Sequence, residues 1–298
     1  MHPIRTAEEL LIRAAASGIV PSSWFVTVPD PATLHARSGK LSIEIASHCW
    51  NYAHLLVYQL SSLVNFPPTR VTVCMTVFHA PEDEPTRAML AYFGALTVPG
   101  VTWNWVELPR QELFRRGIGR NRVARQTGAD WVWFTDCDTV FHRDCLDGLA
   151  DQLQRRRDRM VYPRGEHITS LLDETDPLLA TKHVEPRVLD IDTSRFEFRA
   201  LRHATGPYQI VHGDVARACG YCEQIKFFQR PVERWSKAYE DRSFRWLMGT
   251  GGVALDVPGV YRIRHQHKGR YGDNPLEARF RGAVRRVQEK QKKRQATR

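Results

Sequence analysis

The sequence predicts an α/β fold in which a mostly parallel sheet is flanked by helices. Strand-like and helix-like segments alternate from Leu41 to Asp136, and this alternation is typical of parallel strands joined by crossover helices. The run 131–134 is wholly apolar and aromatic or β-branched, as buried strands of parallel sheets are. Because 42% of the 298 residues are hydrophobic, the chain can bury a substantial core.

The first half of the chain contains most of the regular pattern. Short apolar runs predict strands at 41–46, 71–77, 101–108, 131–134 and 160–163. Helical spacing predicts helices at 51–64, 86–96, 119–128 and 147–157. The sequence therefore predicts successive strand–helix units as far as Asp136.

The second half is less regular. Residues 164–206 show no clear period, and long irregular segments of compact domains are usually functional. A strand then leads into a helix near Asp214, whose carboxylate suits an N-cap. Glu240 and Asp241 open another helix, and alternation predicts a strand at 260–264.

The domain organisation follows from these patterns. Prolines break the segment that precedes the first strand, and basic residues dominate the end of the chain. We expect an N-terminal extension (1–40), one domain (41–275) with a nucleotide- and metal-binding half (41–163) and an acceptor and catalytic half (164–275), and a basic amphipathic tail (276–298).

The net charge belongs mainly to the tail. The chain carries +10, of which +7 lies in 276–298, so a nucleic-acid-binding core is not expected. Four apolar residues of the tail share one helical stripe: Leu276, Phe280, Val284 and Val287. Such a helix can lie on an anionic membrane, although a plain solvated end is the alternative.

Two features bear on location. The sequence has no apolar run of 18 residues and no apolar segment typical of a secretory signal, so neither a membrane span nor export is expected. The six cysteines form no disulfide-like framework, and we read Cys219 and Cys222 as two buried thiols. A cytoplasmic protein, with contact at the membrane face through its tail, is expected.

Paired carboxylates follow the strand at 131–134. Asp136 and Asp138 are two residues apart, so on an extended chain they point the same way. Ligands of open α/β sheets bind beyond the carboxyl ends of the strands. The pair therefore suits a divalent cation that holds substrate phosphates, although a polar loop is the alternative.

Two further polar pairs occur near the C-terminus. Glu240 and Asp241 lie in the first turn of a helix, where the helix dipole alone would favour them. His265 and His267 share one face after a strand, and neutral imidazole is a good Mn²⁺ ligand.

These motifs occur in a familiar order. The run Gly-Arg-Asn at 119–121, a short helix, an apolar strand and Asp-Cys-Asp at 136–138 resemble the nucleotide-sugar-dependent glycosyltransferases of GT-A fold, in particular the large inverting glycosyltransferase family 2. The resemblance spans roughly residues 41–270. It implies a GT-A-like, Rossmann-like domain that binds Mn²⁺ or Mg²⁺.

The resemblance also implies site residues. The donor diphosphate and metal would bind Asp136, Cys137 and Asp138, with His267 completing the metal shell and His265 as the alternative. The nucleotide sugar would further contact Ala46, Ser47, His48, Arg120, Asn121, His212, Gly213, Lys268 and Arg270. The chain departs from the family after the second strand, where Phe78–Asp83 replaces a short acidic turn.

The family keeps a Glu-Asp pair at the start of a helix after the metal motif. The match implies that Asp241 is the base that deprotonates the acceptor hydroxyl and that Glu240 contacts the acceptor. The expected reaction moves a sugar from a nucleoside-diphosphate sugar, by family frequency a UDP-sugar, to a hydroxyl of a saccharide or lipid-linked acceptor.

Two other functions remain open at this point. A nucleotidyltransferase that makes sugar nucleotides would usually have a glycine-rich loop after the first strand, where this chain has Ser47–Trp50. A non-catalytic binding protein with a basic tail would leave both acidic motifs unexplained.

Overall fold

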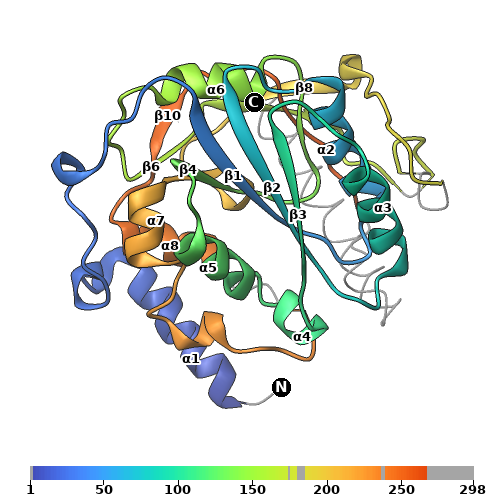
Figure 1. Cartoon of the computed structure of the whole chain (residues 1–298). Coiled ribbons are helices and arrows are strands. Elements are labelled where there is room, and N and C mark those ends of the chain that lie inside the picture. The colour runs from blue at the N-terminus through green and yellow to red at the C-terminus, as the bar shows by residue number, and fades with distance from the viewer. Residues whose placement is uncertain (1–2, 174, 180–184, 236–238, 267–298) are drawn as a thin grey trace, which may run out of the picture.

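The computed structural model describes residues 3–173, 175–179, 185–235 and 239–266, and a seven-stranded sheet forms its centre (Figure 1). The strand order is β10-β6-β9-β4-β1-β2-β3. These strands are β1 (Leu41–His48), β2 (Val71–His79), β3 (Val101–Glu107), β4 (Trp131–Phe134), β6 (Met160–Pro163), β9 (Gln209–His212) and β10 (Val253–Leu255). Four of the six pairings are parallel, so the predicted mostly parallel α/β sheet is confirmed.

Helices flank this sheet (Figure 1). In chain order they are α1 (Pro3–Ala14), α2 (Ala53–Asn65), α3 (Glu84–Gly94), α4 (Arg110–Leu113), α5 (Arg116–Gln126), α6 (Cys145–Leu153), α7 (Gly213–Cys219) and α8 (Glu240–Met248). Helix α2 is buried along most of its length, because its sequence is apolar nearly all round. Helix α5 begins at Arg116, three residues before the predicted start.

The centre of the sheet explains where a site can form. Strand β1 lies between β2 and β4 and is parallel to both, and residues such as Ile43, Ile45 and Trp133 are fully buried there. The carboxyl ends of β1, β2 and β4 therefore meet at one edge, which is where open α/β sheets bind ligands.

A second sheet corrects the prediction for 164–206. Its four strands, in the order β5-β11-β7-β8, are β5 (Thr139–Phe141), β11 (Val260–Arg262), β7 (Gly165–Thr169) and β8 (Phe196–Ala200). The segment is therefore not irregular throughout, because β7 and β8 pair with each other. Residues from both predicted halves, 41–163 and 164–275, enter both sheets, and the domain boundaries stay predictions.

The N-terminal segment packs against α8. The Trp246 indole donates a hydrogen bond to the Val20 carbonyl at 2.9 Å, and the rings of Phe25 and Trp246 meet edge to face at 5.1 Å. The described part of 1–40 therefore covers the helix that begins with Glu240 and Asp241.

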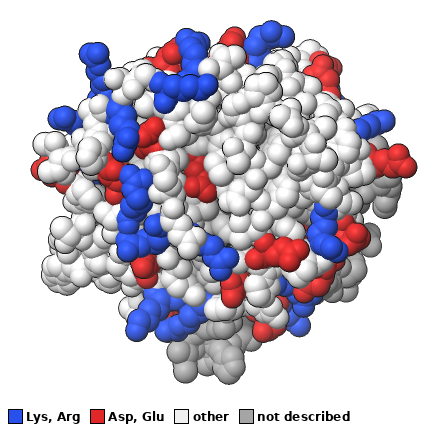
Figure 2. Space-filling model, viewed as in Figure 1, with Lys and Arg blue, Asp and Glu red and all other residues white. Residues whose placement is uncertain are grey.

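The surface of the described residues mixes both signs of charge. Figure 2 shows acidic and basic side chains interspersed over the face viewed in Figure 1. None of the helices in the described part of the chain has the length and hydropathy needed to cross a membrane. The predicted basic tail, 276–298, lies outside the described residues.

Candidate active site

A cavity of about 220 Å³ opens at the carboxyl ends of β1 and β4. Acidic, basic, aromatic, aliphatic and thiol side chains line the cavity: His48, Cys49, Trp50, Tyr52, Leu55, Leu113, Phe114, Arg116, Asp136, Cys137, Asp138, Trp235, Arg262 and His265. The predicted motif 136–138 therefore lies in the cavity wall, together with His48 and His265.

The backbone of the Asp136–Asp138 turn is fixed from two sides. The buried Gln59 of α2 donates its amide hydrogens to the carbonyls of Asp136 (2.9 Å) and Thr139 (3.0 Å). The amide of Ile263, which follows β11, donates to the Asp138 carbonyl at 3.0 Å. These contacts use only main-chain oxygens of the turn, so they leave the carboxylate oxygens of Asp136 and Asp138 for contacts on the cavity side.

Among the described residues, Arg116 is the cation closest to the Asp136 carboxylate. Its guanidinium donates a hydrogen bond to Asp136 Oδ1. The charge of Asp136 raises the pKa of Arg116 against the opposing effect of burial, and Glu240 and Asp241 raise it further. Sequence analysis missed Arg116, although its position four residues before Arg120 places both on one face of a helix.

Arg120 and Asn121 lie away from the cavity lining. Arg120 is 1% exposed and donates to Tyr221 Oη (2.8 Å) and to the Gly206 carbonyl (3.0 Å), while it lies 3.6 Å from Asp136. Asn121 accepts the Tyr221 amide at 2.8 Å. Because α5 starts at Arg116, these residues are not at the helix N-terminus as predicted, and both hold the site's framework together.

Asp138 and His265 lie close enough to each other to share one cation. The distance from Asp138 Oδ2 to His265 Nε2 is 4.0 Å, and two ligands each about 2.1 Å from an ion lie at most about 4.2 Å apart. Within the described residues, no three His, Cys, Asp or Glu side chains are grouped so as to hold a metal ion, and Asp136 is bonded to Arg116. Carboxylate and imidazole suit Mn²⁺ or Mg²⁺, and within the described residues Asp136 could join the pair only by moving away from Arg116.

Three of the predicted site residues cannot be compared with the structure. His267, Lys268 and Arg270 lie outside the described residues, so their roles stay predictions. His265, the alternative ligand, is buried and lies three residues after the end of β11.

A buried acid next to the cavity was also missed. Glu166 of β7 is fully buried and accepts a hydrogen bond from Tyr208 Oη at 2.5 Å, while its Oε2 lies 3.0 Å from Arg262 Nε. Arg199 donates to the other oxygen of Glu166. Glu166 thereby holds Arg262 at the cavity wall, a contact that strand alternation alone cannot reveal.

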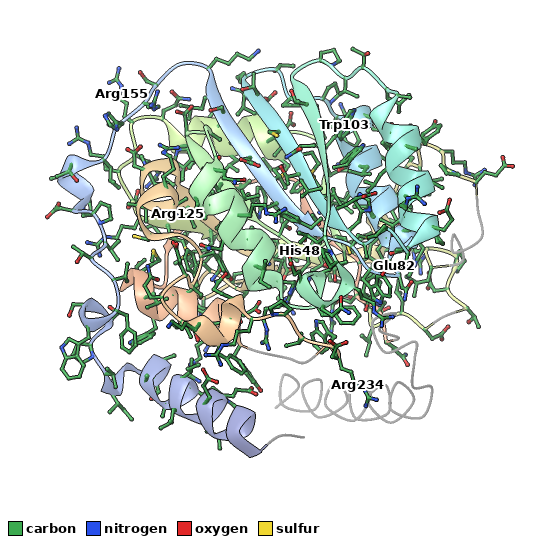
Figure 3. All side chains as sticks on the ribbon, turned by 60° about the horizontal axis from the view of Figure 1, so that its bottom comes forward. His48, Glu82, Trp103, Arg125, Arg155 and Arg234 are labelled. Carbon is green, nitrogen blue, oxygen red and sulfur yellow. The ribbon has the colours of Figure 1, made fainter. Side chains whose placement is uncertain are left out.

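His48 ends β1 beside the same turn. Figure 3 shows it at the opposite end of the sheet from Arg155. Its ring stacks on Phe78 at 4.8 Å, and among the described residues neither ring nitrogen has a hydrogen-bond partner. Burial lowers the pKa of His48 well below its usual range, and Arg120 and Arg116 lower it further, so the ring is neutral at pH 7.

Ala46 and Ser47 are fully buried in β1 and are not cavity-lining residues. The Ala46 carbonyl accepts the Thr135 amide at 3.0 Å. Ala46 and Ser47 therefore do not line the cavity, and the Ala46 carbonyl supports the chain just before Asp136.

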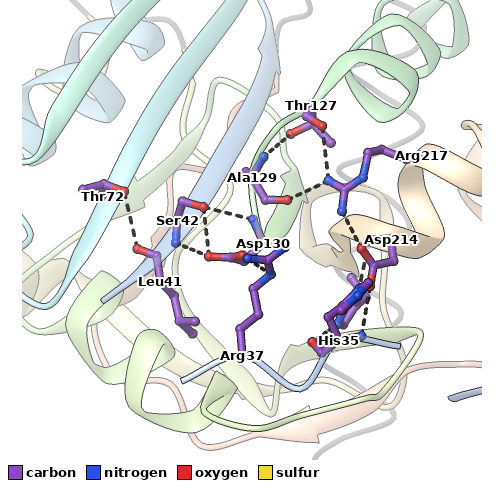
Figure 4. Close-up of polar contacts among 11 residues, drawn as sticks. His35, Arg37, Leu41, Ser42, Thr72, Thr127, Ala129, Asp130, Asp214 and Arg217 are labelled. Carbon is purple, nitrogen blue, oxygen red and sulfur yellow. Dashed lines mark hydrogen bonds and ion pairs between the residues drawn. The ribbon is translucent and has the colours of Figure 1, made fainter. Parts of the chain in front are cut away.

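The structure contradicts the predicted placement of His212 and Gly213. Strands β9 and β4 are antiparallel, so His212 pairs with Trp131 at the start of β4, whereas Gln209 pairs with Phe134 beside the Asp136 turn. The neighbouring Asp214 binds His35 and Arg217 in the cluster of Figure 4. The turn that reaches the site is therefore 206–209, because an antiparallel strand reverses which end is near.

That turn meets the second acidic motif. Gln209 Nε2 donates to the Asp241 carbonyl at 2.9 Å, and a Cβ on Gly206 would lie 3.7 Å from the Asp241 Cβ. Since Arg120 bonds to the Gly206 carbonyl and lies beside Asp136, one buried arginine connects the two acidic motifs. Glu240 is buried, whereas the Asp241 side chain is 38% exposed.

A family model described as glycosyl transferase family 2 matches residues 104–220. The matched segment includes α5, β4 and the turn 136–138, and it confirms the family resemblance. It supports a glycosyltransferase. The search of curated proteins found no match.

The chain also resembles solved structures at low identity. The mannosyltransferase PcManGT from Pyrobaculum calidifontis, in complex with GDP-Man and Mn²⁺, is 16% identical with a TM-score of 0.43, over 88% of this chain and 65% of that one. Two structures of S. aureus TarS 1-349 are also similar, each with a TM-score of 0.44 and 60% of the TarS chain covered. The structure with UDP is 13% identical over 75% of this chain. The structure with UDP-GlcNAc is 14% identical over 77% of this chain. The chain thus spans less than two thirds of each, and this likeness carries no ligand or residue role to it.

Proposed function

We propose, from the premise that residues 104–220 match glycosyl transferase family 2, that this protein is a metal-dependent inverting glycosyltransferase. It would move a sugar from a nucleoside-diphosphate donor, with UDP as the first candidate, to a hydroxyl of a saccharide or lipid-linked acceptor.

The position of Arg116 near both acidic motifs supports this proposal best. Arg116 bonds to Asp136, and its charge interacts with Glu240 and Asp241, about a hundred residues later in the sequence. An inverting transfer needs cations at the leaving diphosphate and a carboxylate on the acceptor side. This arrangement brings both within reach of one substrate.

The basic residues of the cavity have the role of binding the diphosphate. Arg116 is the first residue of α5, so its guanidinium adds to the favourable field of a helix N-terminus. Arg262 faces the cavity from the other side, oriented by Glu166. Both can donate to phosphate oxygens in the forked geometry of arginine.

Asp136, Asp138 and a histidine, His267 or its alternative His265, would hold Mn²⁺ or Mg²⁺. Such an ion, when bound, neutralises charge on the leaving nucleoside diphosphate. His48, which lines the cavity with a neutral ring, would contact the donor nucleotide.

Asp241 would accept the acceptor proton. Its main chain is anchored by Gln209, and Arg245 Nη1 lies 3.6 Å from its Oδ2, so the carboxylate is oriented. Glu240 would contact the acceptor, since adjacent helical residues point about 100° apart and only one can face the attacking oxygen.

Location remains part of the proposal. All six cysteines are free thiols, which suits a reducing cytoplasm. Contact of the tail with an anionic membrane would suit a lipid-linked acceptor.

The direct test is binding followed by stereochemistry. Calorimetry with UDP and GDP, with and without Mn²⁺, should show Mn²⁺-dependent binding of one nucleotide that Asp138→Ala abolishes. NMR of the product should show inversion at the anomeric carbon. Metal-independent binding of equal strength in the variant, or retention of configuration, would contradict the proposal.

A further inference from the structure

The N-terminal segment contacts α8, the helix that carries the proposed base, near both of its ends. Near the C-terminal end of α8, Trp246 donates to the Val20 carbonyl at 2.9 Å and packs against Phe25. Just before the N-terminal end, the Arg13 guanidinium of α1 lies over the Tyr239 ring, 4.2 Å from its centroid. The segment that precedes the first strand therefore touches the chain on both sides of the proposed base.

Helix α1 has attachments of its own to the domain. Glu8 Oε2 lies 3.4 Å from Arg230 Nη1, but the Arg230 side chain is 60% exposed, so water screens this ion pair. Ala16, just after α1, is buried, and the turns that follow α1 pack against α8 (Figure 1). These contacts together fix α1, and with it the position of Arg13.

Tyr239 is the residue from which α8 starts. Its carbonyl accepts the amides of Arg242 at 3.1 Å and Ser243 at 3.2 Å, which are hydrogen bonds of the first turn of the helix. Its own backbone is left-handed, with a φ of 53°, and a residue with a side chain keeps this conformation only where surrounding contacts hold it. The contact with Arg13 is of this kind, because it fixes the Tyr239 ring from a different segment.

We propose that Arg13 is a positioning residue for Asp241. Asp241 is the second residue of α8, so fraying or rotation of the first turn would move its carboxylate. Arg13 acts through Tyr239, because a cation is attracted to the face of an aromatic ring and Tyr239 anchors that turn. The effect on transfer rests on the proposed function of Asp241, whereas the hold of Arg13 on the helix does not.

The other contacts of Asp241 depend on the same turn. Gln209 donates to its carbonyl at 2.9 Å, and Arg245 Nη1 lies 3.6 Å from its Oδ2. Arg245 is four residues after Asp241, so the two side chains share one face only while the first turn is helical. Because a misplacement of about 1 Å can cost about 10²-fold in rate, a loosened first turn should slow the proton transfer.

Hydrogen exchange of the full-length protein tests the hold on the helix. Arg13→Met keeps most of the side-chain length and removes the charge, so the amides of 240–248 should exchange about three- to tenfold faster, while those of 131–139 stay unchanged. Arg13→Lys keeps a cation and should restore most of the protection. Arg13→Met should add little to Tyr239→Leu, since both changes remove the same contact. The control is Leu11→Ala, at an exposed position of the same helix, which should leave the exchange unchanged.

Turnover tests the positioning itself. UDP release from UDP-glucose, UDP-galactose and UDP-GlcNAc measures the reaction, and calorimetry with UDP and Mn²⁺ measures the donor site. In Arg13→Met, kcat should fall about three- to tenfold while the Kd of UDP stays within about twofold, and Arg13→Lys should recover most of the kcat. A variant that only unfolds more easily would lose turnover and donor binding in equal measure.

The two parts of the inference fail in different ways. If none of the three donors is turned over, or if Asp241→Asn keeps a normal kcat, the failure lies in the proposed function, and faster exchange at 240–248 in Arg13→Met still shows that Arg13 holds the helix. If exchange at 240–248 is unchanged in Arg13→Met, or if kcat and UDP binding fall together, Arg13 is not a positioning residue and the inference is wrong.

Discussion

Replacing Arg116 with methionine should change the affinities for metal and for nucleotide in opposite directions. In the ligand-free protein Arg116 occupies Asp136, so it competes with a cation for that oxygen. In the donor complex the same guanidinium would bind phosphate. Methionine keeps most of the side-chain length and removes the charge.

The magnitudes follow from the exposure of the pair. A hydrogen bond to a charged group contributes about 1.5–3 kcal/mol. The side chains of Arg116 and Asp136 are 29% and 30% exposed, so water screens their interaction and lowers its contribution to about 1 kcal/mol. Mn²⁺ alone should therefore bind Arg116→Met about fivefold more tightly. Loss of a phosphate contact should weaken UDP binding at saturating Mn²⁺ by about 10- to 100-fold.

Calorimetry measures both affinities on the same sample. The control is Arg122→Met, because Arg122 is an exposed arginine of the same helix, and both of its affinities should be unchanged. If Arg116→Met binds Mn²⁺ alone more weakly, or binds UDP as the unaltered protein does, the competition between arginine and metal for Asp136 is refuted.

Three further predictions concern other parts of the chain. Burial opposes ionisation of Asp214, but hydrogen bonds from His35 and Arg217 outweigh it and lower the pKa of Asp214. The stabilisation by the ionised carboxylate is present above the unfolded pKa of about 3.9 and is lost as pH falls below it. Urea unfolding should therefore show Asp214→Asn destabilised by about 1–3 kcal/mol at pH 7 and by less at pH 3. In Gly119→Ala the new Cβ would lie 2.4 Å from His48 Nε2, so thermal unfolding should show a loss of about 1–3 kcal/mol that Gly128→Ala, with open space around it, does not show. Deleting 276–298 should lower binding to anionic vesicles at low salt, as measured by co-sedimentation, and equal binding would exclude the membrane role.

The central sheet could be predicted from the sequence because each strand is a short apolar run. Residues 131–134 are apolar at every position, and the structure buries all four between neighbouring strands. Alternation predicted β11 of the second sheet, but β7 and β8 could not be predicted, since β8 is mostly exposed, with Glu197 and Phe198 on its surface, and neither strand has a clear alternation.

The site was predictable where one motif sits at a strand end. Asp136 and Asp138 follow β4 directly, and the sheet edge fixes their position. The positions of His212 and Gly213 could not be predicted in this way, because they depend on whether β9 runs parallel or antiparallel to β4. Strand direction is a tertiary property that no local pattern encodes.

Residues that act through contacts between distant segments were the hardest to predict. Arg262 is held by Glu166, almost a hundred residues earlier, and neither residue stands out in its own segment.

The kcat of sugar transfer by Asp241→Asn tests the central claim most directly. The amide keeps the shape of the side chain but cannot accept a proton at neutral pH. If Asp241 is the base, kcat should fall by about 10²–10⁴-fold, while the donor Kd stays within about twofold. Turnover close to that of the unaltered protein would show that Asp241 is structural and would contradict the proposed mechanism.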